Sequence, residues 1–143
     1  MNQSNQEKVI RLELPANFKY LNVLGACVGA MLERVEDLAD REIVAYNVEL
    51  ALHETCTNIV AHAYAGKTGR IDVEIHLEEE PRRLVIDLRD NGMSFNLDAT
   101  PQPNLNEAQT NGYGLFLIKE LLDEVTYNPG KSENHWRLVK YLL

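Results

Sequence analysis

A row of three polar side chains is the part of this sequence best suited to chemistry. Glu54, Asn58 and His62 recur every four residues, so in a helix they lie along one face. They combine a carboxylate, an amide and an imidazole, which accept protons and exchange hydrogen bonds. Burying an amide without a partner costs about 1–3 kcal/mol, and burying a charge costs more. We therefore expect a polar network or a bound ligand to satisfy this row.

Two glycine-containing stretches lie at a predicted strand end and a predicted helix start. Asp90-Asn91-Gly92 is an ordinary turn sequence when it is considered alone. Gly112-Tyr113-Gly114 precedes a helix, where free N–H groups and flexible glycines accept an anion. Each stretch also has a purely structural explanation, as does the polar row, which is compatible with a satisfied core network or a solvated helix edge.

Two helices are predicted in the first half of the chain. The polar row belongs to a helix over about residues 42–64, because an apolar row of the same period lies beside it. That apolar row is Val44, Val48, Leu52, Thr55 and Ile59. Asp40 resembles the N-cap of this helix, and Gly66 ends it. Apolar residues also recur at helical spacing over about residues 18–39, with Asn17 as a candidate cap.

Five stretches have the character of strands, at residues 8–14, 71–77, 84–88, 124–127 and 136–141. Residues 71–77 alternate between apolar and polar side chains, which is the period of a half-buried strand. The next strand follows after a short turn, so the two predict a hairpin. Pro15 stops the first strand, which indicates a strand at the edge of the sheet.

The element order predicts the fold class. Residues 93–111 show no sustained period, and loops of this length inside compact domains are usually functional lids or disordered segments. A glycine-led helix follows at about residues 112–122. The order is strand, helix, helix, hairpin, lid, helix, hairpin. We therefore expect an α/β two-layer sandwich, with a mixed or antiparallel sheet covered on one face by helices.

Composition limits the class of protein. With 143 residues, 45% of them hydrophobic, we expect a single domain over residues 1–143 with an ordered core at about residues 8–142. There is no apolar run of about 18 residues, and the polar start lacks the regions of a signal peptide, so we expect a cytoplasmic protein without a membrane partner. Cys27 and Cys56 lie in apolar helical patterns, which predicts reduced core residues.

The charge balance argues against nucleic acid as a partner. The net charge is −8, from 22 acidic and 14 basic residues. Such a chain repels a phosphate backbone, and it has no stripe of Lys and Arg. A small anionic ligand remains compatible with this charge, because backbone amides and a divalent metal bind phosphate even in an acidic protein.

Three short motifs occur in order along the chain. The first, E-x-x-x-N-x-x-x-H-A-Y, is formed by Glu54, Asn58, His62, Ala63 and Tyr64. The second, D-x-G-x-x-F, is formed by Asp90, Gly92 and Phe95, and the third, G-x-G-L-x-L-I, by Gly112, Gly114, Leu115, Leu117 and Ile118. With these motifs the chain resembles, over about residues 8–142, the anti-sigma-factor type serine kinases of the GHKL (histidine-kinase-like) ATPase superfamily.

The resemblance implies the Bergerat ATP-binding fold, with ATP and Mg²⁺ as cofactors. Asn58 would bind the Mg²⁺ that bridges the phosphates, Asp90 would accept a hydrogen bond from the adenine amino group, and Gly92 would let the base approach closely. Residues 112–115 would offer backbone amides to the phosphates. The residues that the resemblance assigns to the nucleotide are therefore Asn58, Asp90, Gly92, Phe95, Gly112, Tyr113, Gly114 and Leu115.

The same resemblance makes Glu54 the general base. Phosphoryl transfer depends on positioning and charge neutralisation more than on covalent help, so a metal, backbone amides and one proton acceptor are sufficient. The implied function is an ATP-dependent protein serine kinase. Its phosphoacceptor would be a small anti-anti-sigma-type protein, and it would also sequester a sigma factor or similar regulator. A homodimer is a further expectation.

Two other functions remain as alternatives. The first is a non-catalytic nucleotide-binding module that sequesters a partner; Glu54 argues against it, because such a module would not need a base. The second is the catalytic domain of a two-component histidine kinase, which is disfavoured because the chain has no helical phosphoacceptor region.

The predicted lid favours the non-catalytic alternative. Many relatives carry a basic residue just before the first glycine of the third motif, where this chain has Asn111. No Lys or Arg occurs between Arg89 and Lys119. A phosphate-binding arginine finger commonly contributes about 10³-fold or more to phosphoryl transfer. Its absence predicts weaker nucleotide affinity or slower transfer, unless Lys67, Arg89, Lys119 or a partner compensates.

Overall fold

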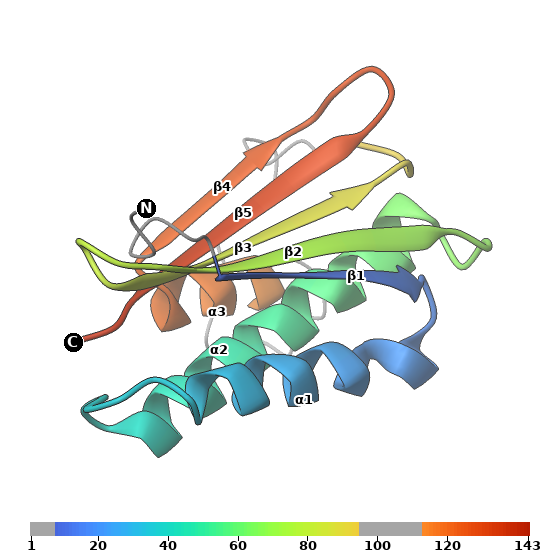
Figure 1. The fold of residues 1–143 in the computed structure, drawn as a ribbon. Coiled ribbons are helices and arrows are strands. Elements are labelled where there is room, and N and C mark those ends of the chain that lie inside the picture. Colours follow the sequence, from blue (N-terminus) through green and yellow to red (C-terminus); the bar gives the residue numbers. More distant parts are fainter. Residues whose placement is uncertain (1–7, 95–112) are drawn as a thin grey trace, which may run out of the picture.

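The computed structural model describes residues 8–94 and 113–143 of the chain. Within these residues five strands form one sheet, and three α-helices pack against one of its faces (Figure 1). This arrangement confirms the predicted α/β two-layer sandwich. The helices are α1 (Leu21–Leu32), α2 (Arg41–Asn58) and α3 (Tyr113–Leu121), and the strands are β1 (Lys8–Pro15), β2 (Arg70–Glu78), β3 (Arg83–Asp90), β4 (Glu124–Asn128) and β5 (Asn134–Tyr141).

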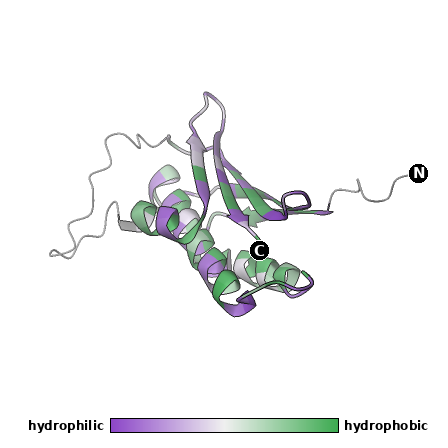
Figure 2. Cartoon of the chain, turned by 90° about the vertical axis from the view of Figure 1, so that its left-hand side faces the viewer, coloured by the Kyte–Doolittle hydropathy of each residue, from purple (hydrophilic) through white to green (hydrophobic). Residues whose placement is uncertain are grey.

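The described sheet has the spatial order β1-β2-β3-β5-β4, and each neighbouring pair in it is antiparallel. β1 lies at one edge, as its Pro15 end predicted. Apolar and polar side chains alternate most clearly along β2, whereas β3 is buried on both faces along most of its length, and the strands change colour along their length in Figure 2. One row of the core side crosses three neighbouring strands at Val73, Leu88 and Trp136, each at most 1% exposed.

α1 is shorter than the helix predicted at residues 18–39. The structure has a 3₁₀ turn (Phe18–Tyr20), and α1 then runs only to Leu32. The start of this segment follows the prediction, because Asn17 acts as the cap: its Oδ1 accepts a hydrogen bond from the Lys19 N–H at 2.9 Å.

The segment between α1 and α2 is a turn, which corrects the predicted helix end. Asp37 and Asp40 have φ angles of 53° and 52°, in the left-handed region that a right-handed helix does not contain. The Arg41 guanidinium donates hydrogen bonds to the carbonyls of Leu32 and Val35, and so holds this turn. Asp40 does precede α2, but its side chain makes no capping hydrogen bond. Asp40 is therefore the N-cap residue of α2, as predicted, but only its backbone carbonyl takes part, by accepting from the Val44 N–H.

α2 carries the predicted apolar row on its core side. Four members of that row are at most 2% exposed: Val48, Leu52, Thr55 and Ile59. The helical path continues past the end of α2 as a π-helical turn (Ile59–Ala63), in which the Tyr64 N–H bonds to the Ile59 carbonyl five residues back. Gly66 follows with a φ of 78°, so the helix stops there as predicted.

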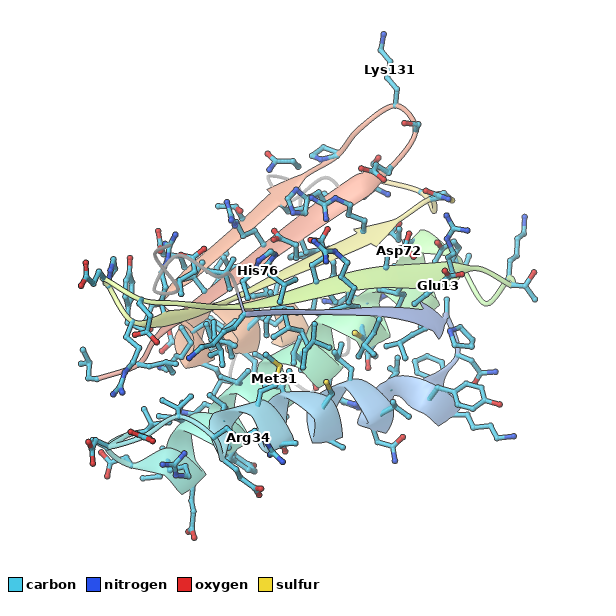
Figure 3. All side chains as sticks on the ribbon, viewed as in Figure 1. Glu13, Met31, Arg34, Asp72, His76 and Lys131 are labelled. Carbon is cyan, nitrogen blue, oxygen red and sulfur yellow. The ribbon has the colours of Figure 1, made fainter. Side chains whose placement is uncertain are left out.

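The sheet face turned away from the helices carries a charged cluster around Asp87, whose side chain is 7% exposed. His135 Nε2 lies 2.6 Å from Asp87 Oδ1, and Arg137 Nε lies 3.5 Å from the same oxygen. His76 Nε2 lies 3.6 Å from Asp87 Oδ2. Figure 3 shows His76 on this side of the sheet and Met31 on the other, between the sheet and α1. This face is therefore polar and ion-paired around Asp87, although Val85 and Val139 on the same face are buried.

Both cysteines are free thiols that pack in or against the core. Cys56 is 1% exposed, and burial raises the pKa of its thiol to about 12. Cys27 is half-buried, and burial raises the pKa of its thiol as well. In the part of the chain that the structure describes, no helix is long and apolar enough to cross a membrane.

Candidate functional site

The predicted motifs meet at the C-terminal half of α2. The loop after β3 packs against the π-helical turn that extends α2, and α3 begins next to Glu54 and Asn58. Strand pairing places the end of β3 beside the start of β5, with Asp90 opposite Asn134. Segments that are distant in sequence therefore surround one place in the fold.

The two side-chain oxygens of Asp90, the last residue of β3, differ in their hydrogen bonds. Asp90 is buried, with 2% of its surface exposed. Its Oδ1 accepts hydrogen bonds from the Gly92 N–H at 2.9 Å and from the Asn134 amide at 3.0 Å. Its Oδ2 is buried and has no hydrogen-bond partner among the described residues. Burial raises the pKa of this carboxyl, and the two hydrogen bonds offset only part of that effect.

The loop after Asp90 is fixed to the end of α2 by backbone contacts. The Met93 N–H donates to the Ala63 carbonyl at 2.7 Å, and the Asn91 N–H donates to the Tyr64 hydroxyl at 2.9 Å. That hydroxyl in turn donates to the Arg70 carbonyl at 2.6 Å. A Cβ on residue 92 would overlap the Ala63 carbonyl and lie 2.8 Å from the Ala63 Cβ. Glycine is therefore required at this position by the packing of the loop on the helix.

Asn134 completes this loop from the opposite side, and the sequence analysis did not find it. Its amide donates to Asp90 Oδ1 and, at 2.9 Å, to the Gly92 carbonyl. Its Oδ1 accepts a hydrogen bond from the Ser94 hydroxyl at 2.7 Å. A signal was available: Asn134 shares the inward strand face with Trp136, two residues on, and a polar residue at an inward position needs partners.

Glu54 and Asn58 lie against the first turn of α3. A Cβ on Gly114 would lie 3.0 Å from Glu54 Oε2 and 3.6 Å from both polar atoms of the Asn58 amide. Both side chains are half-buried, and neither has a hydrogen-bond partner within residues 8–94 and 113–143. His62, the third member of the row, is exposed. The start of α3 therefore faces the Glu54 carboxylate and the Asn58 amide.

The remaining predicted residues are placed only in part. Phe95 and Gly112 lie outside the described residues. Tyr113 is the first residue of α3, and Leu115 is half-buried against the hydrophobic core. The structure thus places Glu54 and Asn58 against Gly114, and it places Gly92, beside Asp90, against Ala63 in the π-helical turn that extends the same helix.

The basic residues considered as substitutes for a lid cation differ in their positions. Arg89 is on the open face of the sheet, where it pairs with Glu74 at 3.3 Å and Glu133 at 3.6 Å. It therefore points away from the site. Lys67 lines a cavity of about 690 Å³ that Gly92 also lines, so Lys67 lies on the same side as the loop after β3. Lys119 is exposed in the last turn of α3.

Comparison with known proteins decides the family. A family model described as the histidine kinase-like ATPase domain matches residues 14–140. The chain belongs to the histidine kinase-like ATPase family. ATP binding is thereby supported as the general property of the domain.

Two curated relatives of this ATPase domain are serine-protein kinases named RsbW. The protein from Bacillus mycoides is 32% identical over 131 residues, which span 81% of this chain and 74% of the relative. The protein from Halalkalibacterium halodurans is 29% identical over 133 residues, which span 85% of this chain and 76% of the relative. The resemblance to anti-sigma-factor type serine kinases is confirmed at the level of the family.

Two solved structures share the fold of this ATPase domain. One contains the RsbU and RsbW domains of Rv1364c from Mycobacterium tuberculosis, with a TM-score of 0.68 and 18% identity; this chain is 94% covered but spans only 32% of that chain. The other is a histidine kinase domain from Erythrobacter litoralis, with a TM-score of 0.57 and 18% identity, covering 90% of this chain and 61% of that one. At such identity these structures support the fold alone.

Proposed function

We propose that this ATPase domain is a protein serine kinase of the anti-sigma-factor type. It phosphorylates a small antagonist protein of the anti-anti-sigma type on serine, and it sequesters a sigma factor or similar regulator. The observation that carries the proposal is the position of Glu54 and Asn58 against the first turn of α3. Asp90 Oδ2, which is buried without a partner among the described residues, supports the adenine-binding part of the proposed site. The names of the curated relatives support the same reaction.

The described residues fit a nucleotide. Asp90 Oδ2 is a buried acceptor without a partner among the described residues, which matches the amino group of adenine. Those residues contain no cluster of three or more His, Cys, Asp or Glu arranged to hold a metal. This fits Mg²⁺, which is commonly bound through one or two protein oxygens together with substrate phosphates and water. Asn58 would hold Mg²⁺ in this proposal; the ion would neutralise charge on the phosphates, and ATP would supply the phosphoryl group.

Glu54 is the proton acceptor of the proposed reaction. The hydroxyl of the substrate serine must lose its proton, and the Glu54 carboxylate holds that proton. Its Oε2 faces the backbone of Gly114 at the start of α3, and the first turn of a helix offers free N–H groups to an anion. The contribution of this chain is therefore positioning, an anion-binding helix start and one base.

A non-catalytic module that holds a nucleotide and a partner is the second candidate. One observation favours it: within the described residues no Lys or Arg side chain is hydrogen-bonded or ion-paired to Glu54 or Asn58, and Arg89 is engaged on the opposite face of the sheet. Such a module would keep the Asp90 interaction and would not use Glu54.

Two measurements test the proposal. Calorimetric titration with ATP and Mg²⁺ should show binding to the wild type and losses of about tenfold or more for Asn58→Ala and Asp90→Ala. Undiminished binding in both variants would refute the assigned site. Transfer of labelled phosphate to a candidate antagonist protein should then fall about 10²–10⁴-fold in Glu54→Gln, with ATP affinity retained.

The matched control is Glu42→Gln, which changes an exposed carboxylate in the first turn of the same helix and should leave transfer unchanged. Wild-type protein that binds ATP tightly but transfers no phosphate to any tested antagonist would support the non-catalytic module instead. Homodimerisation remains a prediction, which light scattering of the purified protein would check.

A further inference from the structure

Asn134 is a buried polar residue that the proposed reaction does not otherwise use. It is the first residue of β5, it is 1% exposed, and it lies directly opposite Asp90 in the strand register. A buried carboxamide without hydrogen-bond partners lowers the stability of the fold by about 1–3 kcal/mol. The hydrogen bonds of Asn134 therefore indicate its role.

The Asn134 side chain joins both ends of the loop after β3. Its amide nitrogen donates to Asp90 Oδ1 at 3.0 Å and to the Gly92 carbonyl at 2.9 Å, with a longer third contact to the Met93 carbonyl at 3.4 Å. Its own oxygen accepts from the Ser94 hydroxyl at 2.7 Å. The carboxamide orientation follows from this arrangement, because the carboxylate and the carbonyl can only accept and the hydroxyl can donate.

The consequence concerns the two oxygens of Asp90. Oδ1 receives hydrogen bonds from Gly92 and Asn134, whereas Oδ2 is buried without a partner among the described residues. A ligand that donates a hydrogen bond to Oδ2 therefore removes a desolvation cost, and a ligand that brings an acceptor to the same place increases it. The amino group of adenine is such a donor, and the carbonyl of hypoxanthine at the same ring position is such an acceptor.

We infer that Asn134 is a positioning residue for base selection: it orients Asp90 so that Oδ2 alone is presented to the exocyclic amino group of adenine. The inference rests on the proposed nucleotide site. Asn134 does not touch the base; it acts through the carboxylate that does. Its effect should therefore depend on whether the base carries the amino group.

The test compares ATP with inosine triphosphate, which carries a carbonyl in place of the amino group. Wild-type protein with Mg²⁺ should bind ATP at least about tenfold more tightly than inosine triphosphate. Asn134→Leu keeps a similar volume and removes the amide donors. It should weaken ATP binding about tenfold while changing inosine triphosphate binding by less than about threefold, so that the preference disappears.

Ser94→Ala is the matched control, because it removes the hydrogen bond at Asn134 Oδ1 and leaves the bond to Asp90. It should retain the preference for ATP. Asn134→Asp provides a second readout that is independent of side-chain volume. It places a second carboxylate beside Asp90, so ATP affinity should fall as the pH rises and both groups ionise.

A merely structural role for Asn134 would weaken both triphosphates equally. An equal loss in Asn134→Leu, or an unchanged preference for ATP, would overturn the inference while leaving the proposed site intact. An Asn134→Asp variant with the pH profile of the wild type would also overturn it. If the wild type bound neither triphosphate, the proposed function would fail first, so the two failures are distinguishable.

Discussion

Gly114 and Glu54 approach each other so closely that a single added methyl group at residue 114 would lie 3.0 Å from Glu54 Oε2. The contact joins the first turn of α3 to the polar row of α2. It makes the position of one carboxylate depend on the absence of a side chain on another helix.

Gly114→Ala should lower phosphate transfer without lowering the stability of the fold. Alanine favours a helix over glycine by about 1 kcal/mol, so the free energy of unfolding should not fall. The added methyl displaces the flexible Glu54 carboxylate, and we expect serine phosphorylation to fall about tenfold or more. Chemical denaturation and a phosphate-transfer assay measure the two effects. Glu120→Ala, at an exposed position of α3, is the control. Full transfer by Gly114→Ala would contradict the assigned geometry.

Gly92→Ala should affect stability, in contrast to Gly114→Ala. Its Cβ would meet the backbone of Ala63 rather than a flexible side chain, so the loop or the helix end must move. Overpacking of this kind costs about 1–3 kcal/mol, and denaturant titration should show that loss. Asn91→Ala alters the exposed neighbour and keeps its N–H, so it should be nearly neutral. Equal stability of the two variants would argue against the packing described.

Asp90→Asn should stabilise the free protein at neutral pH. Burial raises the pKa of this carboxyl, so its ionised form destabilises the folded state at pH values above the raised pKa. As the pH falls through that pKa, Asp90 takes up a proton and the penalty disappears. The gain in melting temperature should therefore be largest at neutral pH and shrink towards acid. The same substitution should weaken ATP binding. A gain that is constant across the pH range would contradict this account.

Tyr64→Phe removes one hydroxyl that joins two segments. This hydroxyl donates to the Arg70 carbonyl and accepts from the Asn91 N–H. We expect a loss of about 1–2 kcal/mol in the free energy of unfolding, measured by denaturant titration. Tyr46→Phe is the control, since Tyr46 lies on α2 and is 65% exposed. If both variants unfold like the wild type, the Tyr64 hydroxyl does not contribute to holding the loop.

The fold was predictable where local periodicity and the core coincide. The apolar row of α2 is buried as its spacing predicted, and β2 alternates as expected, whereas β3 is buried on both faces along most of its length. The end of α1 was not predictable in this way. Residues 33–40 contain apolar positions at helical spacing, and Val35 and Leu38 are indeed buried, but in a turn. The left-handed conformations of Asp37 and Asp40 and the contacts of Arg41 are tertiary features that periodicity does not report.

The site was predictable where one motif carried the chemistry. Glu54 was proposed from its place in the polar row and Asp90 from its turn sequence at a strand end, and the family resemblance supplied the roles, which stay predictions. Asn134 was missed because its partner Asp90 is 44 residues away and the contact depends on the pairing of β3 with β5. The predicted strand also began at residue 136, which left Asn134 in the preceding turn. Starting the strand two residues earlier would have placed Asn134 on the inward face with Trp136, which was the available sequence signal.

The π-helical turn after α2 determines how the residues that follow it are rotated about the helix axis relative to the polar row. It accommodates one more residue than an α-helical turn, and its carbonyl at Ala63 faces the Met93 N–H. Removing one residue between 59 and 63 would restore an α-helix of good geometry. It would also rotate the following residues by about 100° relative to the polar row. The helix would survive, but the carboxylate and amide on one side would no longer be in register with the loop that holds Asp90.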